Sequence, residues 1–414
     1  MTDATDTVVP LDDLAAPRYT PQAQQLREMM ATVAPDYPLD TEVMHRRARE
    51  ATGLSDFGPD DYRERLERYV AELNEIDMHP VGIVNFHMQL LQCLKNRLLL
   101  TDLVSRHPQI PDIELQPPVI IAGLPRSGTT HLHNMLAAAP TFRSLPYWES
   151  VEPFPLPAEA DLDPDPRIAR MDVAVQTMNT LMPNFALMHE MTTEHAHEEI
   201  QLLANDFSTM LMETLAHVPR WTEYYWSHDQ TTSYEYLVVQ LKALQFLRGG
   251  QRWVLKSPQH LGQLPVIERV MPGAVVAFTH RDPVPVALSM IAMITYSARM
   301  YTDVINVEEI AAAWVDRLER LLDKCVRDRD LVPAQRSLDV RFDDFMADEM
   351  GTAERLYDVA AEPLTDAARS AISTYLAGHR RGRHGRVDTS AQMFGLDADE
   401  LRRRFASYTQ RFLT

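Results

Sequence analysis

The fold of this chain is decided by residues 118–132, which read PVIIAGLPRSGTTHL. The apolar run at 119–122 predicts a short strand of a parallel sheet that is covered on both faces. A turn from Gly123 to Gly128 follows, and the apolar stripe that begins at Leu132 predicts a helix. A strand, a tight turn and a helix N-terminus direct backbone N–H groups and the positive end of the helix dipole at one point. We therefore predict an anion cradle; a glycine-bounded turn without a ligand is the alternative.

The loop differs from a nucleotide-triphosphate loop at one position. Gly123 and Gly128 have the G-x-x-x-x-G spacing, but Thr129 stands where the triphosphate loop has its lysine. The cation of this loop is Arg126, whose guanidinium can donate two hydrogen bonds to one anionic group. The loop is therefore expected to hold a phosphate-containing donor in a different manner from an NTPase.

Composition narrows the class of protein. The formal net charge of −19 over 414 residues argues against a nucleic-acid surface and against binding to anionic membranes. Only four of the 40 basic residues are lysines, so each lysine is a candidate for a specific role. Cys93 and Cys325 have no metal-binding spacing and predict free thiols in a reducing compartment. With no secretory signal and no apolar run of membrane-spanning length, we expect a cytoplasmic protein, whose oligomeric state the sequence leaves open.

The chain divides into three predicted regions. Residues 1–17 are expected to form a disordered or loosely attached tail. Residues 18–116 carry apolar residues at helical spacing and predict a helical cap beside the main domain. Residues 117–414 alternate strands with helices, and further strands are expected at 252–256, 274–279 and 337–342.

This alternation predicts an α/β fold. The expected architecture is a mostly parallel P-loop-type sheet flanked by helices, with a helical N-terminal cap and a helical C-terminal extension. In such a fold, ligands bind outside the carboxyl ends of the strands.

A lysine and a histidine come at the end of the strand predicted at 252–256. Lys256 could reach the anion cradle and stabilise charge that builds up on a bridging oxygen. His260 lies four residues further on and could accept the proton of an attacking hydroxyl at neutral pH. The alternatives are a solvated lysine and a histidine that only caps a helix.

An arginine and a serine near the next strand could bind a second phosphate group. Arg281 follows the strand predicted at 274–279, and Ser289 lies about two turns along the next helix. Asp282 is expected to cap that helix. A purely structural pair of Arg281 with Asp282 is the alternative.

A cationic loop lies near the C-terminus. Residues 379–386 read HRRGRHGR in an otherwise acidic chain. The loop could close over an anionic ligand with guanidinium groups and backbone N–H groups, for which the candidates are Arg381, Arg383 and Gly385. The alternative is a solvated charged surface.

Together these segments resemble the sulfotransferases that use 3′-phosphoadenosine 5′-phosphosulfate (PAPS), most closely their large bacterial branch. The loop is also similar to that of tyrosylprotein sulfotransferases. The resemblance implies that PAPS is held at its 5′-phosphosulfate by the loop residues Arg126, Ser127, Gly128, Thr129 and Thr130. It also implies that Arg281 and Ser289 hold the 3′-phosphate and that the basic loop near Arg383 closes over it. Two positions depart from the cytosolic type: Arg126 replaces a lysine, and His131 replaces the aromatic residue that stacks on adenine.

The resemblance implies in-line transfer of a sulfuryl group to a hydroxyl, without a metal. Lys256 and Arg126 would stabilise the phosphate oxygen that leaves. Two residues are candidates for the base: Glu149, which lies 23 residues past Arg126, and His260. Glu149 is slightly preferred. The acceptor is expected to be a hydroxyl of a small molecule, a sugar or a lipid.

Two other classes of protein stay open at this point. A P-loop kinase or NTPase would need the missing lysine and a strand that leads into a magnesium-binding aspartate. A noncatalytic nucleotide-binding module would bind the donor without any transfer.

Two further patterns allow more than one interpretation. Residues 193–199 read TEHAHEE, but on a helix His195 and His197 would point about 200° apart, which disfavours a shared metal ion. An adaptable apolar acceptor site, with core packing as the alternative, is suggested by Met178, Met182, Met188 and Met191 together with Trp221, Tyr224, Tyr225 and Trp226.

Overall fold

A five-stranded parallel sheet forms the centre of the molecule. The computed structural model describes residues 8–379, 386–387 and 389–414. The strand order is β3-β6-β2-β7-β8, and every pair in this sheet is parallel. The strands are β2 (Gln116–Gly123), β3 (Phe142–Arg143), β6 (Arg252–Lys256), β7 (Val275–His280) and β8 (Ser337–Arg341). The predicted α/β class is confirmed, and β6, β7 and β8 lie within one residue of their expected bounds.

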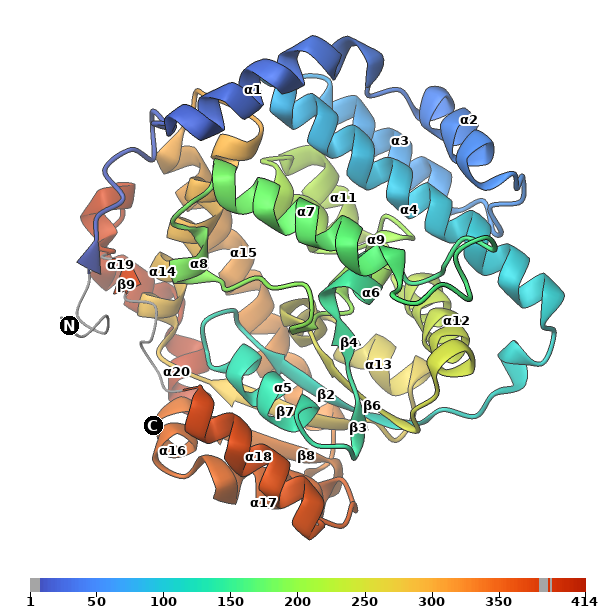
Figure 1. Cartoon of the computed structure of the whole chain (residues 1–414). Coiled ribbons are helices and arrows are strands. Elements are labelled where there is room, and N and C mark those ends of the chain that lie inside the picture. The colour runs from blue at the N-terminus through green and yellow to red at the C-terminus, as the bar shows by residue number, and fades with distance from the viewer. Residues whose placement is uncertain (1–7, 380–385, 388) are drawn as a thin grey trace.

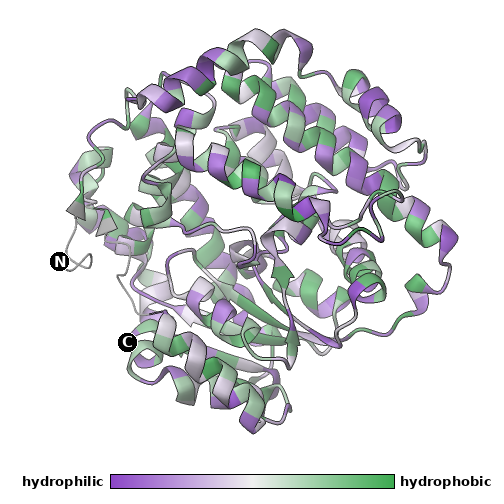
Figure 2. Cartoon of the chain, viewed as in Figure 1, coloured by the Kyte–Doolittle hydropathy of each residue, from purple (hydrophilic) through white to green (hydrophobic). Residues whose placement is uncertain are grey.

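Helices cover both faces of the sheet (Figure 1). Val119 and Ile121 pack in the smaller core with helices α5 (Thr129–Ala137), α16 (Phe342–Ala347), α17 (Glu349–Val359) and α18 (Asp366–Gly378). Ile120 and Ala122 point to the other face and join a larger core with α12 (Thr231–Arg248), α13 (Leu264–Val270), α14 (Pro283–Ser297) and α15 (Val307–Asp328). Coverage of both faces is the reason for the continuous apolar run of β2, and Figure 2 shows the central strands as predominantly hydrophobic.

The N-terminal helices form one layer against this domain. They are α1 (Pro21–Val33), α2 (Thr41–Thr52), α3 (Tyr62–Leu73) and α4 (Pro80–Arg106), coloured blue to cyan in Figure 1. Leu66 of α3 and Leu98 of α4 are fully buried and belong to the same core as Ile120 of the sheet. The cap therefore shares its core with the α/β domain.

The described part of the expected tail packs on the domain. β1 (Val8–Val9) pairs in parallel with β9 (Arg386–Val387). Leu11 and Leu14 are buried, and Arg299 donates hydrogen bonds to the carboxylate of Asp13. This corrects the expectation of a loose segment, because two leucines and an ion pair anchor it.

Several shorter elements complete the fold. Between β3 and β6 the chain forms α6 (Tyr147–Val151), α7 (Pro166–Leu181), α8 (Phe185–Met188), α9 (Ile200–Ala204), α10 (Leu211–Leu215) and α11 (Pro219–Ser227), followed by α12. The C-terminal helices are α19 (Ala398–Arg404) and α20 (Ala406–Phe412). β4 (Leu145–Pro146) and β5 (Ala196–His197) form a small antiparallel pair. The segment with His195 and His197 therefore differs from the helix that the sequence analysis considers for it.

Candidate active site

The loop between β2 and α5 has backbone conformations and close contacts that favour glycine at two positions and need stabilising hydrogen bonds at a third. A Cβ at Gly123 would lie 1.9 Å from the hydroxyl oxygen of Thr279 on β7. Gly128 has a φ of 94°, in the left-handed region that favours glycine. Arg126 adopts the same region at a φ of 69°, which is costly for a residue with a side chain.

Neighbouring side chains hold Arg126 in this conformation. Arg281 donates a hydrogen bond from Nη1 to the carbonyl oxygen of Arg126 over 2.7 Å. Arg126 in turn donates from Nε to Ser289 Oγ over 3.2 Å and from Nη1 to the carbonyl of Met188. Asp282 caps α14 by accepting from the N–H of Val284. The loop cation and the predicted second cation site are therefore adjacent.

The other loop residues shape the cradle. Ser127 Oγ donates to the carbonyl of Leu124 over 2.6 Å and lies 2.7 Å from Thr279 Oγ1, so this hydroxyl ties the loop to β7. The first N–H groups of α5, from Thr129 onward, have no partner within the helix and point out of its N-terminus. Among the residues that the structure describes, no side chain caps this end of α5, where Gly128 is the N-cap residue. The geometry leaves these donors directed at a single position.

His131, on the first turn of α5, lies among aromatic rings. Its ring centroid is 5.5 Å from that of Phe345 and 5.6 Å from that of Tyr375. Its Nε2 lies 2.6 Å from a carboxylate oxygen of Glu349. An aromatic environment is thus present where the family resemblance places adenine.

Lys256 meets the loop and a glutamate at the carboxyl end of β6. Its Nζ forms an ion pair with Glu198 and lies 3.5 Å from Thr130 Oγ1. Its backbone N–H donates to Glu199 Oε2 over 2.9 Å. The Lys256 side chain is nearly fully buried, whereas that of Glu198 is 17% exposed. Glu198 is therefore the accessible carboxylate beside this lysine.

His260 is held in a buried chain of hydrogen bonds. Its Nε2 contacts Glu199, and its Nδ1 lies 2.8 Å from the hydroxyl of Tyr234. Burial raises the pKa of Glu199, but the charge of His260 and the hydrogen bonds outweigh it, so the net shift is downward. Both ring nitrogens of His260 are engaged and the residue is fully buried.

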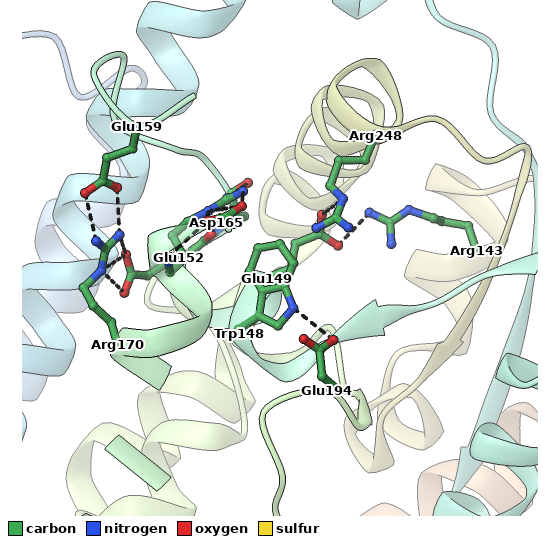
Figure 3. A network of polar contacts seen from close by, with 11 residues as sticks. Arg143, Trp148, Glu149, Glu152, Glu159, Asp165, Arg170, Glu194 and Arg248 are labelled. Atoms are coloured by element: carbon green, nitrogen blue, oxygen red, sulfur yellow. Dashed lines mark hydrogen bonds and ion pairs between the residues drawn. The ribbon is translucent and has the colours of Figure 1, made fainter. Parts of the chain in front are cut away.

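Glu149, the other candidate for the base, is also buried. It is fully buried on α6, with Arg143 Nη2 2.6 Å from Oε2 and Arg248 Nε 3.5 Å from Oε1. Figure 3 shows its carboxylate between the two guanidinium groups, and the indole of Trp148 with its N–H toward Glu194. The family resemblance implies a role as base for Glu149, and in the structure its carboxylate belongs to this ion-pair network.

The two histidines near β5 face each other. His195 Nε2 lies 2.8 Å from His197 Nδ1, and the ring of Tyr147 packs against both. Burial lowers the pKa of each imidazole. Within the described residues, no three His, Cys, Asp or Glu side chains are placed to hold a metal ion.

One large cavity joins these groups. Its volume is about 1500 Å³. Its wall includes Arg126, Glu198, Arg281 and Ser289 of α14. Of the residues considered for an acceptor site, Met178, Met182, Met188 and Met191 line this cavity, whereas Trp221 and Tyr225 are buried in the core. Glu149, Lys256 and His260 are not among the residues that line it. Arg381, Arg383 and Gly385 lie outside the described residues.

Comparison with known proteins explains this arrangement. The profile of the sulfotransferase family matches residues 117–366, more than half of the chain. The chain belongs to the sulfotransferase family. It is similar to the crystal structure of sulfotransferase STF1 from Mycobacterium tuberculosis H37Rv, with 27% identity, a TM-score of 0.77, and coverage of 89% of this chain and 98% of that one. Sulfotransferase STF9 from Mycobacterium avium is 25% identical with a TM-score of 0.80, covering 91% of this chain and 98% of that one. Among curated proteins, none matches the chain significantly.

Family membership indicates that the protein is an enzyme. It also decides against the two other classes, a P-loop kinase or NTPase and a noncatalytic nucleotide-binding module. In the described parts of the chain, no helix has both the length and the apolar character to cross a membrane. Glu198, which the structure places beside Lys256, is not among the candidate site residues of the sequence analysis. The available signals were its place in the polar run 193–199 and the scarcity of lysine, which makes any partner of Lys256 a candidate.

Proposed function

We propose that this sulfotransferase moves the sulfuryl group of PAPS to a hydroxyl group of an acceptor, with Glu198 as the base. The observation that carries the proposal is the meeting of Lys256, Glu198 and Thr130 beside the loop that carries Arg126. A cation, a carboxylate and a helix N-terminus converge there, at the wall of a cavity that can admit two ligands.

The residues present fit the proposed donor. Two guanidinium groups and the N-terminus of α5 favour anionic groups, and Gly123 leaves no side chain in their way. The 5′-phosphosulfate would be held by Arg126, Ser127, Gly128, Thr129 and Thr130. The 3′-phosphate would be held by Arg281 and Ser289, with Arg381, Arg383 and Gly385 closing over it. Adenine would lie beside His131 and Tyr375.

PAPS supplies a sulfuryl group whose S–O bond to phosphate breaks as sulfur bonds to the acceptor oxygen, leaving adenosine 3′,5′-bisphosphate. Glu198 takes the proton of the acceptor hydroxyl, because its carboxylate is accessible from the cavity. Lys256 and Arg126 compensate the charge that develops on the phosphate oxygen. Glu199 positions this pair, because it fixes the backbone of Lys256 and is itself held by His260.

Substitutions at the ion pair test the proposal. Glu198→Gln is expected to lower kcat by about 10²-fold or more, because the acceptor proton loses its base. Lys256→Ala is expected to lower kcat by about 10²–10³-fold, because charge on the leaving oxygen is no longer compensated. Both variants should bind adenosine 3′,5′-bisphosphate within about tenfold of the parent affinity in calorimetry.

Two control variants sharpen the test. Lys324→Ala removes another of the scarce lysines and should leave kcat unchanged, because Lys324 lies on α15 and packs over the ring of Trp226 on α11. Glu149→Gln should lower stability but leave kcat of the folded enzyme within about threefold, because Glu149 only pairs with arginines. A large loss of kcat in Glu149→Gln with normal turnover in Glu198→Gln would assign the base to Glu149 and reject this mechanism. Failure to prefer adenosine 3′,5′-bisphosphate over AMP would reject the donor.

A further inference from the structure

The cavity has a polar end and an apolar end. Within the described residues, the charged side chains that line it are Arg126, Glu190, Glu194, Glu198 and Arg281. All of them come from the loop before α5, the segment around β5, and the start of α14. The walls contributed by α1, α4, α7, α10 and the remainder of α14 are lined by uncharged residues. Charge is thus confined to the end where we place the donor.

Methionine is frequent in the wall of the cavity. Twelve of the 21 methionines of the chain line the cavity. The four that sequence reasoning singled out, from Met178 to Met191, are among them, and Met30, Met88 and Met293 add three more helices to the wall. Unbranched thioether side chains adapt to irregular apolar shapes. On the helices of this end, apolar side chains outnumber the polar ones, which are Asn85, Gln89, Thr177, Thr214, Ser289 and Ser297. Such a lining suits a hydrocarbon better than a sugar, whose hydroxyl groups could pair only with these few side chains.

Helix α14 connects the two ends. Ser289 receives a hydrogen bond from Arg126, so this part of the helix lies at the donor loop. Met293 and Ser297 line the cavity one and two turns further along. With a rise of about 1.5 Å per residue, the lining reaches roughly 12 Å beyond Ser289. Figure 1 shows α1, α4 and α7 together, across the molecule from α17 and α18.

The volume allows two ligands at once. A site for one small molecule usually measures about 300–1,000 Å³, and this cavity has about 1500 Å³. A nucleotide donor would occupy the charged end, and the apolar end would stay available for a second molecule whose reactive group must reach Glu198.

We infer that the acceptor is a long apolar alcohol, of the lipid class, whose hydrocarbon part lies among the methionines of α4, α7 and α14. Its hydroxyl group lies at Glu198 and Lys256. This inference rests on the proposed function. In the transfer, the acceptor's O–H bond breaks and its proton passes to Glu198. The S–O bond between the sulfuryl group and the donor's phosphate breaks, and the sulfur bonds to the acceptor oxygen.

The first experiment varies the acceptor. The full chain is incubated with labelled PAPS and with hexanol, decanol or hexadecanol, and in parallel with glycerol or glucose. The value of kcat/KM should rise by roughly threefold per added methylene group until the apolar end is filled. Decanol should also bind in calorimetry to the protein that already holds adenosine 3′,5′-bisphosphate. Equal or faster transfer to glucose, or no dependence on chain length, would overturn the inference.

The second experiment uses a matched pair of variants on α7. Val175 lines the cavity, whereas Val173 is 64% exposed on the opposite side of the same helix. Val175→Glu should lower kcat/KM for decanol by about tenfold or more and change that for hexanol less, because it places a charge against the longer chain. Val173→Glu should change neither. Should Val175→Glu not fold, Met178→Gln makes a smaller polar change at the same wall, with the same expected direction.

The outcomes separate this inference from the proposed function. Tight binding of adenosine 3′,5′-bisphosphate with transfer to sugars only would leave the function standing and overturn the apolar acceptor. Absence of both donor binding and transfer would overturn both. An equal response of the Val173 and Val175 variants would overturn the placement of the chain along α7.

Discussion

Arg126 shows how a single residue combines charge with an unusual backbone. Its left-handed φ of 69° costs about 1–2 kcal/mol for a residue other than glycine. The hydrogen bond from Arg281 to its carbonyl and its own bonds to Ser289 and Met188 offset that cost. The loop pattern predicts that Arg126 is the cation of the loop. It does not predict the backbone conformation of Arg126, because this depends on partners that lie far away along the chain.

His133 is a buried histidine that makes the stability of the fold depend on pH. It lies fully buried on α5, and its Nε2 is 3.3 Å from the carbonyl of Val254. Burial, with a smaller contribution from the charge of Lys256, lowers its pKa to about 3. An exposed histidine has a pKa of about 6.5, so between these values the unfolded chain binds the proton and the folded chain does not.

Stability should therefore fall as the pH drops below about 6.5, and His133 alone should contribute about 1.4 kcal/mol per pH unit down to about pH 3. In His133→Gln that contribution is absent. Urea unfolding at several pH values should give a shallower dependence in the variant by this amount. Above about pH 7 the two curves should run parallel, because the imidazole is neutral in both states. A slope unchanged by the substitution would contradict this account.

At the scale of elements, sequence patterns predicted those strands and helices that carry their own signal. The strand at residues 252–256 has its predicted bounds, because an apolar run marks it locally. β4 and β5 are two residues each and exist only through their pairing with each other. That pairing places Glu198 beside Lys256. A local pattern holds no information on such a contact, which explains why Glu149 and His260 were considered and Glu198 was not.

The attachment of the cap helices depends on one buried carboxylate. Asp206 is 2% exposed and accepts from Arg65 of α3 over 2.6 Å and from Arg97 of α4 over 3.0 Å. Ser233 of α12 donates to it over 2.6 Å. Two helices of the cap and one helix of the main domain thus meet at a single side chain.

Asp206→Asn is expected to lower the free energy of unfolding by about 3–5 kcal/mol, because it leaves the buried Arg97 without its charge partner and Arg65 with only the half-exposed Asp61. Asp61 offers a matched control, since it also pairs with Arg65, over 3.0 Å, but is 46% exposed. Asp61→Asn should cost about 1 kcal/mol or less. Denaturant unfolding of both variants checks the difference; equal small losses would show that Asp206 does not hold the cap.

At the scale of the whole molecule, the cavity lies where the parts of the fold meet. The sheet provides the donor loop, the segment around β5 provides Glu198, and α4 of the cap provides part of the apolar wall. The two arginines of the donor end lie in a chain with a formal net charge of −19, and they share that end with three glutamates. An anion is therefore attracted locally, at Arg126 and Arg281.

The shared core predicts that the cap and the sheet unfold together. Leu98 of α4 is fully buried in the core that also contains Ile120 of β2. Leu98→Ala should cost about 2–5 kcal/mol, because it leaves a cavity. If unfolding is cooperative, hydrogen exchange followed by mass spectrometry should show the same loss of protection in peptides from α4 and from β2. Leu331→Ala, at a position that is 49% exposed, should change protection by no more than about 0.5 kcal/mol in either. Loss confined to α4 would show that residues 18–116 form a unit that opens independently of the sheet, and the acceptor cavity would then open with it.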